Sequence, residues 1–169
     1  TGVPNANGVL PKIIGGGSNR LFRVESSGKM VVKRLNLTGG RAHGGGAIEV
    51  DGGSLTTFDS EFYKNSGAKV GKWGYGGALS IYNSGNLLLN NVSFRANIAG
   101  QDGGAISLIQ SSSAIVRNCN FQSNEAQGML GGGIFIYSNA KMYLVDCMFA
   151  NNFISRHYGY TTSYGGAIY

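Results

Sequence analysis

Two short words alternate along this chain, and they constrain its fold more than any other feature. One word is Phe-x-x-Asn, and the other is Gly-Gly followed by a small and then an aliphatic residue. The first occurs at Phe62/Asn65, Phe94/Asn97, Phe121/Asn124 and Phe149/Asn152. The second begins at Gly45, Gly76, Gly103, Gly131 and Gly165. Such regular alternation is typical of a repeat architecture in which each unit is one supersecondary element.

Each repeat of roughly 27 residues predicts one coil of a solenoid with two strands. The phenylalanines are 32, 27 and 28 residues apart, and apolar residues alternate at period two around them. After the Gly-Gly words the inward pairs are Ile48/Val50, Leu79/Ile81, Ile106/Leu108 and Ile134/Ile136. Before each Phe the inward sets are Leu55/Thr57/Ser60, Leu87/Leu89/Val92, Ala114/Val116/Cys119 and Met142/Leu144/Cys147.

Composition agrees with short strands and tight turns. The 169 residues include 29 Gly and 2 Pro, only 13% are charged, and no segment carries a sustained 3.6-residue apolar stripe. We therefore predict an all-β, single-stranded parallel β-helix of about five coils. Residues 1–20 form a partial coil or N-terminal cap, and residues 21–169 form β-helix repeats that stop in mid-repeat.

The repeated Phe and Asn are expected to be structural. The four phenylalanines should stack in one buried axial column with Leu37 below them, and the four asparagines should form an axial ladder at a turn, each side-chain amide bonding to the next. A polar binding groove along the asparagines is the alternative interpretation.

From about Leu21 to Tyr169, the paired words resemble the repeat of the chlamydial polymorphic outer-membrane proteins and of the wider pectate-lyase-like β-helix proteins. The resemblance implies a right-handed β-helix used as a cell-surface stalk or adhesin, and hence an extracellular location. The sequence contains no 18-residue apolar run, so direct membrane insertion is not expected. The chain stops within a repeat word, so we expect further repeats, or another copy stacked end to end, to cover the last coil.

The net charge of +6 is unevenly placed. Seven Lys and Arg lie between Lys12 and Arg41, against the single Glu25. This basic segment suits an acidic polysaccharide, lipopolysaccharide or nucleic acid, although outward cations that keep a solenoid soluble are the simpler interpretation. No nucleic-acid motif accompanies it, so a nucleic-acid partner is not expected.

The eight acidic residues give weak support for catalysis. Glu49/Asp51 and Asp59/Glu61 are each two apart on a strand, which is close to the ~6.5–9.5 Å carboxyl separation of inverting glycosidases. Any pair two apart on a strand has about this spacing. We expect no enzyme activity and no cofactor or metal. Polysaccharide binding or cleavage by a lyase or hydrolase is the alternative.

Insertions occur only between Phe-x-x-Asn and the next Gly-Gly word, so candidate contact residues lie on one edge of the solenoid. These aromatic and basic side chains suit a sugar or a protein partner, or else they fold down over the coil edges. They are Lys69, Lys72, Trp73, Tyr75, Arg156, His157, Tyr158, Tyr160 and Tyr164.

Two further motifs concern covalent chemistry. Asn36-Leu37-Thr38 and Asn91-Val92-Ser93 are N-glycosylation sequons whose asparagines are expected to face outward. Cys119 and Cys147 occupy the same column of neighbouring coils. Strands about 4.8 Å apart allow a disulfide by Cα distance, but parallel Cβ vectors favour two packed thiols. The function expected from all these features is a non-catalytic structural or adhesive module of a surface protein or filamentous appendage.

Overall fold

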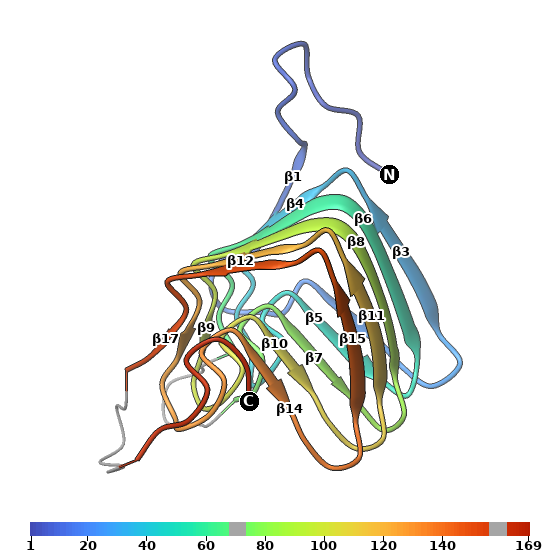
Figure 1. Ribbon diagram of the computed structural model, residues 1–169. Helices are drawn as coiled ribbons and strands as arrows, with labels where there is room; N and C mark the ends of the chain where they lie inside the picture. Colours follow the sequence, from blue (N-terminus) through green and yellow to red (C-terminus); the bar gives the residue numbers. More distant parts are fainter. Residues whose placement is uncertain (68–73, 156–161) are drawn as a thin grey trace.

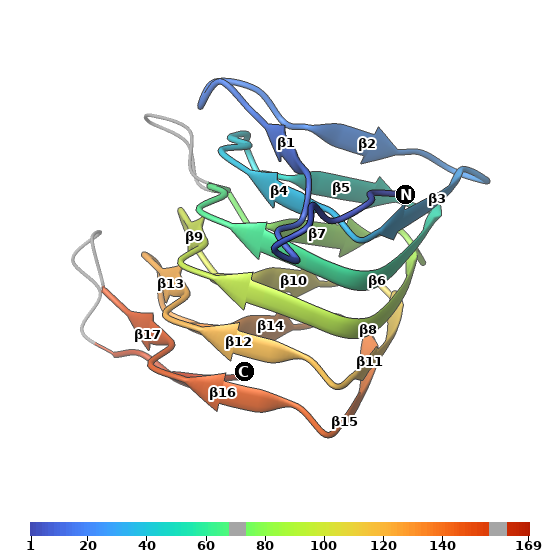
Figure 2. The same cartoon turned by 90° about the horizontal axis from the view of Figure 1, so that it is seen from above.

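The computed structural model describes residues 1–67, 74–155 and 162–169, and its regular elements are all β-strands. The chain winds around one axis, so strands of successive coils lie side by side (Figures 1 and 2). Each of five coils contributes one strand to a central sheet, and every strand pair is parallel. The predicted all-β parallel β-helix of about five coils is confirmed.

The strands form three sheets. The central sheet contains β2 (Phe22–Val24), β5 (Ile48–Asp51), β7 (Leu79–Tyr82), β10 (Ile106–Leu108) and β14 (Ile134–Ile136). A larger bent sheet contains β1 (Lys12–Ile14), β3 (Lys29–Lys33), β4 (Asn36–Thr38), β6 (Ser54–Tyr63), β8 (Asn86–Arg95), β11 (Ser113–Arg117), β12 (Asn120–Gln122), β15 (Lys141–Val145) and β16 (Met148–Ala150). A small sheet contains β9 (Ile98–Ala99), β13 (Glu125–Ala126) and β17 (Phe153–Ile154).

The bent sheet turns a corner at one left-handed residue in each coil. Figure 1 shows the two limbs meeting at this corner, with β3, β11 and β15 on one limb and β4 and β12 on the other. Arg34, Asp59, Asn91, Asn118 and Asp146 all have φ between 48° and 55°. Asn and Asp tolerate this conformation better than other side chains do. The polar column three residues before each Phe is thus a backbone requirement.

Glycine is required at the two positions of the Gly-Gly word for different reasons. Its first glycine takes positive φ, as in Gly76 at 67° and Gly103 at 71°. Its second glycine lies against the coil above, so a Cβ on Gly77 would approach the carbonyl oxygen of Gly104 to 2.1 Å. The following alanine at position 78 is fully buried. The word therefore carries the chain back into the central sheet at positions that have no room for a Cβ.

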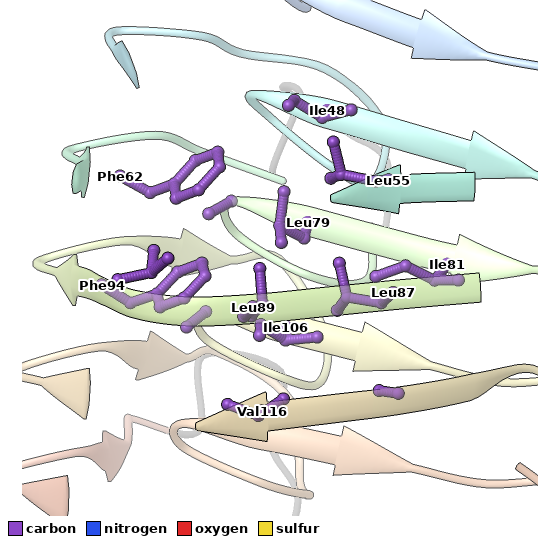
Figure 3. Close-up of a cluster of buried hydrophobic side chains, with 14 of the residues drawn as sticks. Ile48, Leu55, Phe62, Leu79, Ile81, Leu87, Leu89, Phe94, Ile106 and Val116 are labelled. Carbon is purple, nitrogen blue, oxygen red and sulfur yellow. The ribbon is translucent and has the colours of Figure 1, made fainter. Parts of the chain in front are cut away.

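Apolar side chains from the central and bent sheets meet in the interior (Figure 3). Phe62, Phe94 and Phe121 are fully buried, and their rings stack at centroid distances of 4.9 Å with Phe149 continuing the column at 4.7 Å. Leu37 pairs with Phe62 at the lower end of this column. The same coil-to-coil register repeats for every interior column, which makes the core a set of axial ladders.

The four asparagines form a hydrogen-bonded ladder beside the phenylalanine column. Asn65 Nδ2 donates to Asn97 Oδ1 at 3.1 Å, Asn97 to Asn124 at 3.0 Å, and Asn124 to Asn152 at 2.8 Å. Each Nδ2 also donates to a backbone carbonyl of the coil below, as Asn97 does to Phe62 at 2.9 Å. Oδ1 of Asn97, Asn124 and Asn152 accepts in addition from the backbone N–H of the previous asparagine, and Asn65 Oδ1 accepts from the Gly40 N–H. Every polar atom of the buried Asn97 side chain is thus satisfied.

The first residues also stack on the solenoid. Lys12–Ile14 pairs in parallel with Asn36–Thr38, and Gly2 N donates to Lys33 O at 2.7 Å. At the other end, Leu144 is 36% exposed, whereas its counterpart Val116 one coil below is fully buried.

Candidate functional site

A groove lies on the outer face of the central sheet and is lined by ionisable, polar and aromatic side chains. Its cavity volume is about 410 Å³. The floor comes from outward residues of β5 and β7, and the two walls come from the links before the Gly-Gly words and the turns after the central strands. The lining residues are His43, Gly44, Glu49, Tyr75, Ser80, Tyr82, Asn83, Ile109 and Gln110.

Glu49 on the groove floor is held by three donors. Arg20 forms an ion pair with its Oε2, and Arg23 Nε lies 3.3 Å from its Oε1. The Tyr82 hydroxyl donates to Oε1 at 3.0 Å. Arg20 also donates to the carbonyls of Gly44 and Gly45, so the same guanidinium fixes the first Gly-Gly word. Glu49 is only 8% exposed, and these partners compensate for the burial of its charge.

Asp51, two residues farther along β5, is equally engaged. Asn83 Nδ2 donates to Oδ1 at 2.8 Å and Arg23 Nη2 to Oδ2 at 2.9 Å. The hydrogen bond from Asn83, followed by those from Arg23, holds the pKa of Asp51 below its ordinary value. Burial and the neighbouring Glu49 carboxylate raise the pKa of Tyr82 to about 12, so this phenol keeps its proton at neutral pH. Glu49 and Asp51 therefore belong to one network of ion pairs and hydrogen bonds with Arg20, Arg23, Tyr82 and Asn83.

An aromatic row continues from the groove toward the C-terminal coil. Tyr75 stacks on Phe135 at 6.1 Å, and Tyr137 and Tyr169 lie 5.9 and 6.0 Å from the same ring. Phe135 points away from the interior, yet these neighbours leave it only 5% exposed. Tyr137 is 63% exposed. The row offers exposed tyrosine faces around one covered phenylalanine.

The residues selected from the long links divide into two groups. Tyr75 lies in the groove wall. Tyr164, in the later link, is 56% exposed and lies 6.4 Å from the Tyr169 ring. The others lie outside the described residues, namely Lys69, Lys72, Trp73, Arg156, His157, Tyr158 and Tyr160.

The two sequons differ in environment. Asn91 is exposed at the corner of the bent sheet, where its Nδ2 donates to Asp59 at 2.8 Å. Asn36 is only 8% exposed, and its Nδ2 donates to Glu61. Asn36 precedes the inward Leu37 in β4 and so lies on the outward side of the strand, but its side chain is covered and engaged in the folded chain. Asn91 alone of the two offers an accessible acceptor position.

Cys119 and Cys147 are free thiols in adjacent coils. Cys119 Sγ lies 3.1 Å from the Arg117 carbonyl oxygen, and Cys147 Sγ lies 3.3 Å from that of Val145. Burial raises the pKa of the Cys119 thiol to about 12, which disfavours the reactive thiolate.

Sequence reasoning did not identify Arg20, Arg23 or Asn83 as partners of the groove carboxylates. A signal for Arg23 was present, because it precedes Glu49 by 26 residues, close to one coil, and the two are register neighbours. The degenerate first coil obscured that spacing. Arg20 lies outside any strand, so no periodicity places it.

Comparison with known proteins agrees with this geometry. A family described as the right handed beta helix region matches residues 16–169. The chain belongs to the right-handed β-helix family. This membership supports the wider β-helix resemblance and gives the solenoid its hand. No curated protein and no solved structure matches the chain.

Within residues 1–67, 74–155 and 162–169, no helix is long and apolar enough to cross a membrane. No group of three or more His, Cys, Asp or Glu side chains there is arranged to hold a metal ion.

Proposed function

We propose that this β-helix is a non-catalytic structural or adhesive module of an extracellular surface protein or filamentous appendage. It acts as a rigid spacer whose edge links and outer faces make the contacts. The observation that carries the proposal is the pairing of both β5 carboxylates, Glu49 in the groove and Asp51 two residues farther along the strand. Glu49 and Asp51 are bound by Arg20, Arg23, Tyr82 and Asn83, whereas acid–base catalysis needs a group that exchanges its proton with the substrate.

The second acidic pair supports the same conclusion. The corner residue Asp59 lies at φ 48°, so the strand bends between Asp59 and Glu61. Asp59 accepts from Asn91, and Glu61 is paired with Arg95 at 2.9 Å and bonded by Asn36. Each carboxylate thus has a structural partner of its own.

Rigidity supports the spacer role. The phenylalanine stack and the asparagine ladder run through consecutive coils without interruption. Solenoids of this kind are stabilised by nearest-neighbour contacts and grow as rods. The likeness of the repeat words to the chlamydial polymorphic outer-membrane repeats adds support for display at a cell surface.

The experiment compares adhesion with cleavage. The purified chain is applied to a glycan array, and the same glycans are assayed for released reducing ends. We expect binding without release, and Asp51→Asn or Asp59→Asn should change neither result. Glycan cleavage lost on either substitution would overturn the non-catalytic assignment.

The edge links are tested separately. Trp73→Ala and Tyr158→Ala should weaken adhesion and leave the melting temperature nearly unchanged if these links contact a partner. Tyr75→Ala serves as a comparison, because it removes a ring stacked on Phe135 and should lower the melting temperature as well. A large loss of stability in the first two variants would indicate that these aromatics cover the coil edges.

A polysaccharide-cleaving role is the second candidate, and one observation favours it. His43, Tyr82 and Glu49 line the same 410 Å³ groove, so an imidazole, a phenol and a carboxylate border one hollow. If the groove cleaves glycans, His43→Ala and Tyr82→Phe should abolish product release and leave glycan binding largely intact. Equal, negligible release by the parent and both variants supports the non-catalytic function.

End-to-end stacking with further repeats or another copy belongs to the same proposal. Analytical ultracentrifugation of the 169-residue chain over a range of concentrations tests self-association. Oligomers that grow with concentration are expected, and a monodisperse monomer at every concentration would contradict stacking between copies.

A further inference from the structure

A second chemically distinct face of the solenoid is the solvent-facing side of one limb of the bent sheet. We name as the outer wall the outward residues of β3, β11 and β15 and of the first halves of β6 and β8. They form three axial columns in strict register. The polar column is Lys29, Ser54, Asn86, Ser113 and Lys141. The apolar column is Val31, Thr56, Leu88, Ile115 and Tyr143, and the third is Lys33, Phe58, Asn90, Arg117 and Val145.

The apolar column is open to solvent. Val31 is 64% exposed, Ile115 39% and Tyr143 65%. Together with the partly exposed Thr56 and Leu88, these side chains form a largely apolar stripe along the axis. An exposed stripe rimmed by polar residues marks a contact surface more often than scattered single apolar residues do.

A shallow hollow of about 280 Å³ lies between the polar and apolar columns on β6, β8 and β11. Ser54, Asn86 and Ser113 line its polar side, and Ser113 Oγ donates to Asn86 Oδ1 at 2.7 Å. Thr56, Leu88 and Ile115 line its apolar side. The hollow thus presents hydroxyl and amide groups along one edge and aliphatic groups along the other.

The charge on the outer wall has one sign. The three columns hold Lys29, Lys33, Arg117 and Lys141 and no carboxylate. None of these four cations forms an ion pair within the described part of the chain. On the groove side, by contrast, Arg20 and Arg23 are neutralised by Glu49 and Asp51. The unpaired cations call for an anionic partner.

We propose that the outer wall binds an anionic polysaccharide laid along the solenoid axis. Lys29 and Lys141 are four strand spacings apart, roughly 19 Å, so cations at the two ends contact separate anionic groups of one extended chain. The polar column bonds to sugar hydroxyls, and the apolar column packs against the C–H faces of the rings. This surface deepens the adhesive function proposed above and depends on it.

The same chemistry disfavours other occupants. The row of hydroxyl and amide groups between the cations, Ser54, Asn86 and Ser113, does not match the apolar interior of a lipid surface. A peptide strand needs a free sheet edge, whereas the backbone of the outer wall is already paired between coils. A second copy of this face would bring like charges together.

The test measures binding of the whole chain to immobilised alginate, dextran sulfate and neutral dextran at low and high salt. Binding to alginate or dextran sulfate that weakens with salt is expected, with none to neutral dextran. Alginate carries carboxylates and dextran sulfate carries sulfates, so these arms distinguish the two sources of anionic charge. No binding to either polyanion at low salt overturns the proposal.

The paired variants locate the surface. Lys29→Glu with Lys141→Glu should lower affinity by roughly tenfold or more, because two contacts become repulsive. Lys12→Glu with Lys64→Glu changes net charge equally at exposed positions away from the outer wall and should have much less effect. Equal losses of affinity in the two double variants would show that binding depends on net charge alone and would overturn the proposed site.

Two further readouts separate the remaining outcomes. Tyr143→Ser, which removes an exposed ring, should weaken binding and reduce its salt-independent part. Binding to vesicles of anionic phospholipid but not to either polysaccharide would overturn the inference in favour of a membrane. Release of alginate fragments by the bound protein would contradict the non-catalytic function and leave the binding surface intact.

Discussion

At the scale of single residues, Asp102 connects one coil to the next. It lies between β9 and the Gly103-Gly104 word and is only 3% exposed. Its Oδ1 accepts from the backbone N–H groups of Met129 and Leu130 at 3.0 and 2.8 Å. Burial raises the pKa of Asp102, and these two hydrogen bonds only partly offset the effect. The side chain fastens the following link while carrying a charge that its site disfavours.

Asp102→Asn and Asp102→Ala should therefore differ in sign. Asn keeps an acceptor and removes the buried charge, so stability at neutral pH should be equal to or above that of the parent. Ala leaves two buried N–H groups without this acceptor and should cost about 1–3 kcal/mol. Urea denaturation measures both values. Equal losses in the two variants would contradict the role of the charge.

The pH dependence follows from the direction of the shift. The folded-state pKa of Asp102 lies above its ordinary value of 3.8, so the folded chain binds this proton more tightly than the unfolded chain. The contribution of Asp102 to stability is thus greatest below 3.8 and falls as pH rises through the folded-state pKa. The stability advantage of Asp102→Asn over the parent should grow across the same interval.

At the scale of elements, the stability lost on substitution within an axial column depends on where in the column the residue lies. Phe121 is covered by Phe94 and Phe149, and it is fully buried. Phe149 has a ring on one side in this chain and is only partly buried. Identical side chains in one column therefore differ in how much surface they hide from water.

Phe121→Ala should destabilise the chain by about 3–5 kcal/mol, as expected for a buried aromatic side chain. Phe149→Ala is the matched control and should cost clearly less. Denaturant unfolding of both variants gives the comparison. A Phe121→Ala variant as stable as the parent would show that the stack does not support the core.

Replacing one asparagine of the ladder by a charged side chain should lower the stability of the chain strongly. In Asn97→Asp, one oxygen keeps the acceptor role, but the other replaces the amide that donates to Phe62 O and Asn124 Oδ1. A buried carboxylate facing two acceptors should cost on the order of 3–5 kcal/mol at neutral pH. Its folded-state pKa should be raised, so part of the loss should be recovered in acid. Asn97→Ala, which cannot titrate, should lose stability without this recovery.

At the scale of the whole molecule, the solenoid separates its charges by face. The β5 carboxylates Glu49 and Asp51 are paired with Arg20 and Arg23, and Glu61, two residues beyond the corner, is paired with Arg95. The outer wall keeps unpaired cations. Because each coil contacts only its neighbours, stability should also vary along the axis.

Hydrogen exchange should reveal this axial gradient. Backbone amides of β8, which has a coil on each side, should exchange more slowly than those of β15 and β16 in the 169-residue chain. Mass spectrometry of peptic fragments resolves the three strands. Uniform protection would indicate that all coils unfold together.

The coil can be inferred from the repeat period alone, because stacked strands place equivalent residues above one another and so make their spacing regular. Phe62, Phe94 and Phe121 recur with Asn65, Asn97 and Asn124 at a constant offset, which is sufficient to infer the buried column and the ladder beside it. The Gly-Gly words likewise mark the close approach of the coils. All these features repeat, so each occurrence supports the others.

Contacts between residues that do not repeat could not be inferred from the period and became visible in the folded chain. Arg20 reaches Glu49 from outside the strands, Asp102 bonds to the next link, and Asn36 is covered although its sequon matches that of Asn91. The unpaired state of Lys29 and Lys141 depends equally on where the few carboxylates lie. The length of a side chain's reach, its burial and its pairing across coils depend on the three-dimensional arrangement, and the repeat spacing in the sequence does not specify them. The folding frame therefore follows from the sequence, whereas the chemistry of its faces follows from the fold.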